Sequence, residues 1–314
     1  MSTARWLEHW FSGIVAADLN PDRRVVVVAT ADLADRAVAE FDDGVSTVLV
    51  PRAGHVQSRH QESRVVGYRG SFLPADGRVT LPDAVTIELR SYGLAEFGEL
   101  FGPTVWRVAD DEDFSAYLRD ADAARLDGRF APHLTNPRVL VADLAALGGP
   151  AERSGPRDRL LVRPDGTIST SPTGGAIGRL GESTADLDRT WREHVSCSVA
   201  PCPVCLSAAV PERDRADALR ERPWLARYLT AIEALRAAGR DGRTVGRVSG
   251  FGGRISPVLP WSPAVVDPVD APVIIEIDDP AHLLVHDPVT GQRRLVGVAS
   301  GAEMEAGFGD PGSG

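Results

Sequence analysis

The spacing of apolar residues near the N-terminus predicts a strand, a helix and a second strand. Residues 24–29 form a continuous, mostly valine run, which is typical of a strand buried on both faces. Residues 32–41 have helix-compatible composition and an acidic start, and residues 45–50 are again largely apolar. This order predicts a short parallel pair. The turn at residues 29–32 contains no glycine, so it lacks the close backbone approach that a dinucleotide needs.

Shorter apolar runs follow, separated by turns that contain proline and glycine. Strands are predicted at residues 63–68, 78–81, 84–89, 104–108 and 138–144. The first three alternate and are expected to be antiparallel strands or sheet edges. The acidic cluster at residues 110–113 opens a predicted helix that runs to about residue 124, where the helix dipole favours negative charge. It is therefore interpreted as a helix start rather than a metal site.

The second half of the chain predicts hairpins and helices. Pro164-Asp165-Gly166 lies between two apolar runs and has the composition of a hairpin turn. Helices are predicted at residues 184–194, 213–222 and 224–238. Strands are predicted at residues 273–277, 283–285 and 294–298, the last two joined as a hairpin.

Glycine and proline between residues 148 and 156 interrupt this pattern and predict a domain boundary. The predicted fold class is mixed α/β. An N-terminal domain over residues 1–149 would hold the strand–helix–strand sheet. A C-terminal α+β domain over residues 157–306 would hold the hairpins, the cysteines and the helical segment, and residues 307–314 would form a flexible tail.

Composition narrows the classes of partner. The formal net charge of −10 opposes attraction to nucleic acid and to anionic lipid. No apolar run approaches the roughly 20 residues that a membrane span needs, and no apolar stretch of signal-peptide length precedes a small-residue cleavage site. We therefore expect a cytoplasmic protein with neither nucleic acid nor membrane as partner.

All 34 basic residues are arginine, and the chain contains no lysine. An arginine side chain stays protonated, so it cannot act as an amine nucleophile. This excludes lysine Schiff-base chemistry, pyridoxal-phosphate attachment and a lysine-bearing phosphate loop. The motifs of common metalloproteases, serine hydrolases and nucleotide hydrolases are absent as well, although other enzyme classes remain open.

The three cysteines, Cys197, Cys202 and Cys205, lie close together, and His194 precedes the first of them. The order H-x2-C followed by C-x2-C supplies the four ligands of a tetrahedral zinc site, which makes zinc the candidate cofactor. The alternatives are an iron–sulfur cluster, which would need a fourth cysteine, a nucleophilic cysteine, and buried or incidental thiols. A disulfide is disfavoured in the cytoplasm.

Two further groups of residues have a binding interpretation and a structural one. Four glycines, at positions 174, 175, 178 and 181, could line a phosphate site, but the favoured interpretation is a turn, because no buried strand and no lysine accompany them. His282 and His286 fall in a predicted strand, where four residues span about 13 Å. They therefore cannot bind one ion together.

The segment LLVRPDGTISTSPTGGAIGRLGE, taken together with SCSVAPCPVCL, resembles a known family. The resemblance covers about residues 160–206 and is to the actinobacterial daptide biosynthesis RiPP recognition proteins, which are encoded beside enzymes that modify a ribosomally made peptide. It implies a non-catalytic protein that binds a precursor peptide and presents it to an oxidative decarboxylase, an aminotransferase and a methyltransferase.

Peptide recognition of this kind commonly uses a small winged-helix element whose sheet edge accepts the leader peptide as an added strand. The predicted order of hairpin and helices is compatible with such an element. The alternative hypothesis is a metal- or cofactor-dependent enzyme that uses Cys197, Cys202 and Cys205. The sequence leaves the question of enzymatic activity open and favours the binding function.

Overall fold

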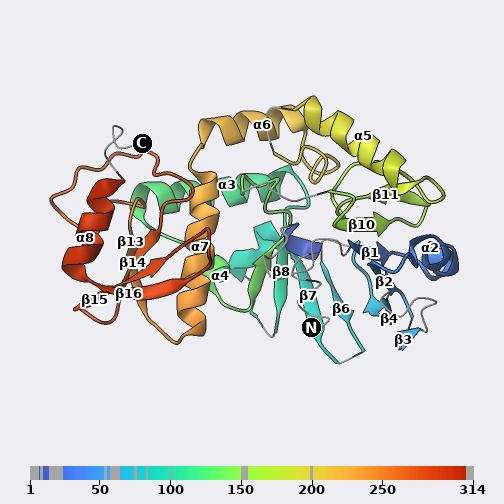
Figure 1. Ribbon diagram of the computed structural model, residues 1–314, viewed down its shortest axis with the longest axis horizontal. Coiled ribbons are helices and arrows are strands. Elements are labelled where there is room, and N and C mark those ends of the chain that lie inside the picture. Colours follow the sequence, from blue (N-terminus) through green and yellow to red (C-terminus); the bar gives the residue numbers. More distant parts are fainter. Residues whose placement is uncertain are drawn as a thin grey trace. The chain divides into compact units, whose positions relative to one another are not determined.

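A computed structural model of the protein describes two compact units, each built from two separate segments of the chain (Figure 1). The first comprises residues 1–114 and 140–220, and the second comprises residues 115–139 and 221–314. The described residues are 7, 10–13, 24–52, 55–56, 64–73, 76–82, 84–97, 99–100, 102–149, 155–198 and 201–308. Helices and three sheets are both present, so the predicted mixed α/β class is confirmed.

The first unit is built around strand β1 (Arg24–Val28). It is followed by the short 3-10 helix η1 (Ala31–Leu33), helix α2 (Ala34–Phe41) and strand β2 (Ser46–Val50), which pairs with β1 in parallel. The predicted strand–helix–strand unit is therefore confirmed. On its other side β1 pairs in parallel with β10 (Arg159–Val162), from a distant part of the chain.

The whole sheet has seven strands, including β1, β2 and β10, in the order β12-β11-β10-β1-β2-β4-β3. The outer strands are β3 (His55–Val56), β4 (Arg64–Gly67), β11 (Thr167–Ser169) and β12 (Gly178–Arg179). Strand β4 was expected to be antiparallel or a sheet edge, but it pairs with β2 in parallel and with β3 on its other side. Its Val65 and Val66 are buried, as in a strand covered on both faces.

A second sheet in the same unit has the order β5-β6-β7-β8-β9. Its strands are β5 (Arg69–Gly70), β6 (Gly77–Thr80), β7 (Thr86–Ser91), β8 (Thr104–Arg107) and β9 (Val139–Val141). The predicted antiparallel pairing of β6 with β7 is confirmed, whereas β7 and β8 are parallel. The 3-10 helix η2 (Tyr92–Phe97) and helix α3 (Asp111–Asp127) flank β8 in the chain, and the acidic residues predicted to start a helix do so.

Two hydrophobic clusters explain the continuous valine run of β1. Val25 and Val27 face a cluster that contains residues of the second sheet, such as Leu89 and Val105. The alternate valines, at positions 26 and 28, face a cluster with helix α2 and with Leu187 of helix α5 (Thr184–Ser196). Both faces of β1 are therefore buried, as the sequence predicts.

The division of the chain differs from the predicted boundary between residues 149 and 157. Strand β10 and the hairpin that follows it belong to the first unit, because β10 completes the sheet beside β1. Helix α5 and all but the last residue of helix α6 (Glu212–Glu221) also belong to that unit. The glycine- and proline-rich segment is thus a connection within one unit.

The second unit contains a four-stranded antiparallel sheet, in the order β13-β14-β15-β16. Its strands are β13 (Val245–Val248), β14 (Val273–Ile277), β15 (His282–His286) and β16 (Arg293–Gly297). Helix α4 (Pro132–Thr135) contacts helix α7 (Leu225–Arg240), which packs on β13 and β14. Helix α8 (Val298–Gly307) was not predicted and packs on β15 and β16 (Figure 1). Most of the predicted tail, residues 309–314, lies outside the described residues.

None of the helices in the described ranges combines the length and the apolar content needed to cross a membrane.

A side-chain hydrogen bond links the end of β1 to the residue that follows β4. The hydroxyl of the buried Tyr68 donates to the carbonyl of Val28 at 2.7 Å. We expect Tyr68→Phe to lower the free energy of unfolding by about 1 kcal/mol, because a buried hydrogen bond is lost. Urea unfolding followed by circular dichroism measures the change.

Tyr228→Phe is the matched control, because the buried Tyr228 hydroxyl has no hydrogen-bond partner among the described residues. It should leave the stability unchanged or raise it. Equal losses in the two variants would contradict the assignment.

Candidate functional site

The segment with the hairpin, the glycines and the cysteines forms one side of the first unit. Strands β10 and β11 pair around Pro164-Asp165-Gly166, and Gly166 has a φ of 77°, so the predicted hairpin is confirmed. Helix α5 begins after Ser183, whose side chain accepts a hydrogen bond from the backbone of Asp186. Such an N-cap satisfies one of the backbone N–H groups that the first turn of a helix leaves unpaired.

The glycine-rich segment is a turn whose backbone amides bond to the protein itself. The N–H of Gly174 donates to Ser171, and the N–H of Gly175 donates to the carbonyl of Val204. Gly178 lies in β12, and a Cβ there would come within 2.3 Å of the Leu187 side chain. The glycines therefore serve packing and pairing, which supports the turn interpretation over the phosphate site.

The four predicted zinc ligands do not come together. Cys202 and Cys205 are joined by a disulfide, so neither supplies a thiolate. Cys197 is a free, exposed thiol at the end of α5, and His194 is exposed in the last turn of that helix. In the part of the chain that is described, no group of three or more His, Cys, Asp or Glu side chains is placed to hold a metal ion.

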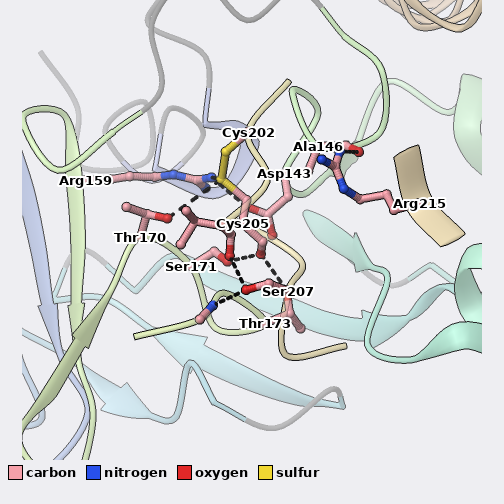
Figure 2. The surroundings of a disulfide bond; sticks show 12 residues. Asp143, Ala146, Arg159, Thr170, Ser171, Thr173, Cys202, Cys205, Ser207 and Arg215 are labelled. Atoms are coloured by element: carbon pink, nitrogen blue, oxygen red, sulfur yellow. Dashed lines mark hydrogen bonds and ion pairs between the residues drawn. A yellow bond between two sulfur atoms is a disulfide. The ribbon is translucent and has the colours of Figure 1, made fainter. Parts of the chain in front are cut away.

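The sulfur of Cys205 lies among hydrogen-bond donors (Figure 2). The Arg159 guanidinium, from β10, donates to it through Nη2 at 3.4 Å. The hydroxyl of Thr170, just after β11, is 3.7 Å from the same sulfur. Cys202 and Cys205 are themselves buried, with 4% and 1% of their surface exposed. The environment of this disulfide is therefore polar and protected from bulk solvent.

Arg159 also forms a buried ion pair with Asp143. Nη2 lies 2.6 Å from the Asp143 carboxylate, and Nη1 donates to the carbonyl of Trp10 at 2.8 Å. Burial raises the pKa of Asp143, while the charge and the hydrogen bond of Arg159 act in the opposite direction. One guanidinium thus connects β10, residues 10–11, Asp143 and the disulfide.

The disulfide loop also anchors the neighbouring turn through its carbonyl groups. The hydroxyls of Ser171 and Thr173 donate to the carbonyl of Cys205 (Figure 2). The backbone N–H of Ala208 donates to the carbonyl of Thr173. Cys202 has a φ of 44°, which non-glycine residues seldom adopt. The conformation of the loop from 202 to 208 is therefore coupled to the turn from 171 to 175.

The two histidines of β15 make separate contacts, as expected for a strand. His282 contacts Asp279 at 2.7 Å, whereas His286 is buried. Burial lowers the pKa of His286, and this effect exceeds the opposite effect of Glu233 on α7. Burial in the second unit thus disfavours the protonated form of this histidine.

A cavity of about 250 Å³ lies in the first unit, where β4 ends and β5 begins. It is lined by Arg52, Gly67, Tyr68, Arg69, Thr80, Leu81, Pro82 and Ala84. Arg52 is engaged by an ion pair with Asp35 at 2.8 Å. The described lining contains neither histidine nor carboxylate, so it offers arginines for binding rather than groups for acid–base chemistry.

Strand β16 is an open edge of the second unit's sheet. It pairs with β15 on one side, and no described strand pairs with its other side. Four of its five residues are exposed, and Leu295 is 43% exposed. An open edge presents backbone N–H and C=O groups to which an added strand can bind.

The pairing of β15 with β16 determines which residues of β16 point their backbone N–H and C=O groups away from the sheet. Across the turn, the N–H of Asp287 donates to the carbonyl of Gln292. Because hydrogen-bonded pairs alternate in an antiparallel ladder, Arg294 and Val296 bond to β15. The backbone groups of Arg293, Leu295 and Gly297 therefore point away from the sheet.

Sequence reasoning identified the cysteines but missed the residues that surround them. Arg159 and Asp143 are separated in sequence by the segment that was interpreted as a domain boundary, so they were assigned to different domains. The all-arginine composition was a signal that some guanidiniums are buried, because arginine is the residue suited to buried ion pairs. It did not indicate which ones.

No protein-family profile, curated protein or solved structure matches this chain.

Breaking the buried ion pair tests its contribution to the first unit. Arg159→Met leaves the Asp143 carboxylate buried without its partner, so we expect a loss of about 3–5 kcal/mol in the free energy of unfolding. Adding Asp143→Asn removes that charge and should restore part of the loss. Urea unfolding of both single variants and the double variant measures the coupling, and strictly additive losses would contradict it.

The buried histidine predicts how stability depends on pH. Because the folded-state pKa of His286 is lowered, the unfolded state takes up a proton first as the pH falls below the ordinary value near 6.5. Stability is therefore present above that value and is lost as the pH falls through the lowered pKa. His286→Gln should lose less stability between pH 7 and pH 5 than the wild type, measured by urea unfolding. An unchanged pH profile would contradict the prediction.

Proposed function

We propose that the chain is a non-catalytic recognition protein that binds a ribosomally made precursor peptide at the open edge of β16. It then presents this peptide to the modifying enzymes of a daptide-type pathway in the cytoplasm. The observation that supports the proposal is the unpaired, exposed edge of β16, in a sheet against which helices α7 and α8 pack. The resemblance of residues 160–206 to recognition proteins supplies the class of peptide.

Main-chain hydrogen bonds would supply most of the affinity. The outward N–H and C=O groups of Arg293 and Leu295 and the outward N–H of Gly297 repeat at every second residue, which is the spacing that an extended peptide needs to join as an additional strand. The carbonyl of Gly297, the N-cap of α8, is used by that helix. Gly297 has no side chain to obstruct it. The edge is five residues long, which matches the length of an ordinary strand.

Side chains along the edge would select the peptide. Leu295 and the exposed Val298 offer apolar contacts, and Arg294 makes no ion pair among the described residues. Its neighbour Arg293 is paired with Asp241 at the end of α7. The free guanidinium of Arg294 therefore favours a peptide with a carboxylate side chain near its binding register.

The edge can be tested with one residue changed in two ways. Leu295→Pro removes an outward N–H, a change that the outer side of an edge strand tolerates, whereas Leu295→Ala keeps the N–H and removes the apolar side chain. The probe is a fluorescein-labelled synthetic peptide with the sequence of a candidate precursor, chosen by sequencing the DNA on either side of the gene. We expect the proline variant to raise Kd by about tenfold or more, measured by fluorescence anisotropy.

Leu295→Ala should change Kd by less than about threefold, because the main-chain hydrogen bonds remain. Circular dichroism confirms that both variants are folded. Equal binding by the proline variant and the wild type would place the peptide elsewhere. Failure of the wild type to bind this peptide would overturn the recognition function itself.

A further inference from the structure

We propose that Cys202 and Cys205 form a reducible thiol–disulfide site, with Cys202 as the attacked sulfur and Cys205 as the leaving thiolate. The inference is independent of peptide binding and concerns a different unit of the chain. Three observations carry it: the short separation of the two cysteines, the backbone conformation of Cys202 and the donors around the Cys205 sulfur.

The short separation limits what the disulfide contributes to stability. The two cysteines are three residues apart, and the stabilisation from closing a loop grows with loop length. A cross-link of this kind restricts the unfolded chain less than one that closes a long loop. Reversible reduction of the disulfide therefore explains its presence better than stabilisation of the fold does.

The backbone of Cys202 favours opening. Its φ of 44° lies in the left-handed region, which is unfavourable for residues with a Cβ. While the disulfide is closed, the cross-link to Cys205 helps to hold this conformation. Reduction removes the cross-link, so Cys202 can relax to a more favourable backbone conformation. This relaxation stabilises the dithiol state relative to the disulfide.

The donors around Cys205 favour its departure as a thiolate. Arg159 Nη2 and the Thr170 hydroxyl both lie within reach of its sulfur (Figure 2). A thiolate accepts hydrogen bonds more strongly than a disulfide sulfur does, and a stabilised leaving thiolate speeds exchange. Cys202 is 4% exposed and follows the partly exposed Pro201, and its sulfur has no comparable donor among the described residues, so we assign Cys202 Sγ as the attacked sulfur.

The reaction is an ordinary thiol–disulfide exchange. The thiolate of an incoming thiol attacks Cys202 Sγ, the bond between Cys202 and Cys205 breaks, and Cys205 leaves as a thiolate. A second thiol then attacks the mixed disulfide at the incoming sulfur and releases Cys202, which takes up a proton. Two electrons pass from the two thiols to the cysteine pair, and the thiols become a disulfide.

Glutathione is the probe in the first experiment, carried out with Cys197→Ser so that the pair holds the only cysteines. The folded protein is equilibrated in buffers of varied reduced and oxidised glutathione, thiols are trapped with a maleimide, and labels are counted by mass spectrometry. We expect the count to rise from zero to two while circular dichroism remains that of the folded protein. A pair that stays closed in every buffer and opens only in urea would overturn the proposal.

Thr170 provides a matched pair of variants. Thr170→Val removes the hydroxyl near Cys205 Sγ, and Thr170→Ser keeps it. We expect the valine variant to favour the disulfide by about threefold or more in the glutathione equilibrium, because the thiolate loses a donor. The serine variant should match the wild type. Equal shifts in both variants would show that the hydroxyl has no role, which would overturn the assignment of Cys205 as the stabilised thiolate.

Discussion

The need to cover β1 on both faces and along both edges determines the architecture of the first unit. Five consecutive buried residues, four of them valine, cannot remain in contact with water, and a parallel strand requires neighbours on either side. Residues 46–50 supply one neighbour, and residues 159–162 supply the other. The unit is therefore discontinuous in sequence, and the residues that follow β10 are brought into it.

Arg159 has a position that follows directly from this pairing. It is the first residue of β10 and pairs with Val25, so its buried side chain lies beside Asp143 and the disulfide loop. A buried guanidinium needs a carboxylate and further acceptors, and here carbonyls and a sulfur complete the set. The polar environment of the cysteines is thus a consequence of how the central sheet is closed.

Local patterns in the sequence identified the strand–helix–strand unit, the hairpin at residues 164–166 and three of the four strands of the second unit's sheet; strand β13 was missed. These features depend on turn residues and on the burial of neighbouring segments, which a short window of sequence contains. The pairing of β10 with β1 depends on contacts between distant segments, and the glycine- and proline-rich residues before it resemble a linker. This is why the boundary was placed at residues 149–157.

The same limit applies to the cysteines. Their spacing alone is compatible with zinc ligation, a disulfide or free thiols, because ligand sets and cross-links both use pairs of cysteines with two residues between them. The distinction depends on whether His194 and Cys197 turn toward the pair. Both are exposed at the end of α5, and that orientation depends on how the helix packs against the sheet through Leu187.

The discontinuity of the first unit has a consequence for synthesis on the ribosome. Strand β1 emerges long before its partner β10, and at about 5–20 residues per second the delay is on the order of ten seconds. During that time a hydrophobic strand has one open edge, and Leu187 of α5 does not yet cover one of its faces, a state prone to pairing with other chains. The yield of folded protein should therefore depend on slow synthesis and on chaperones more than the size of the chain alone would suggest.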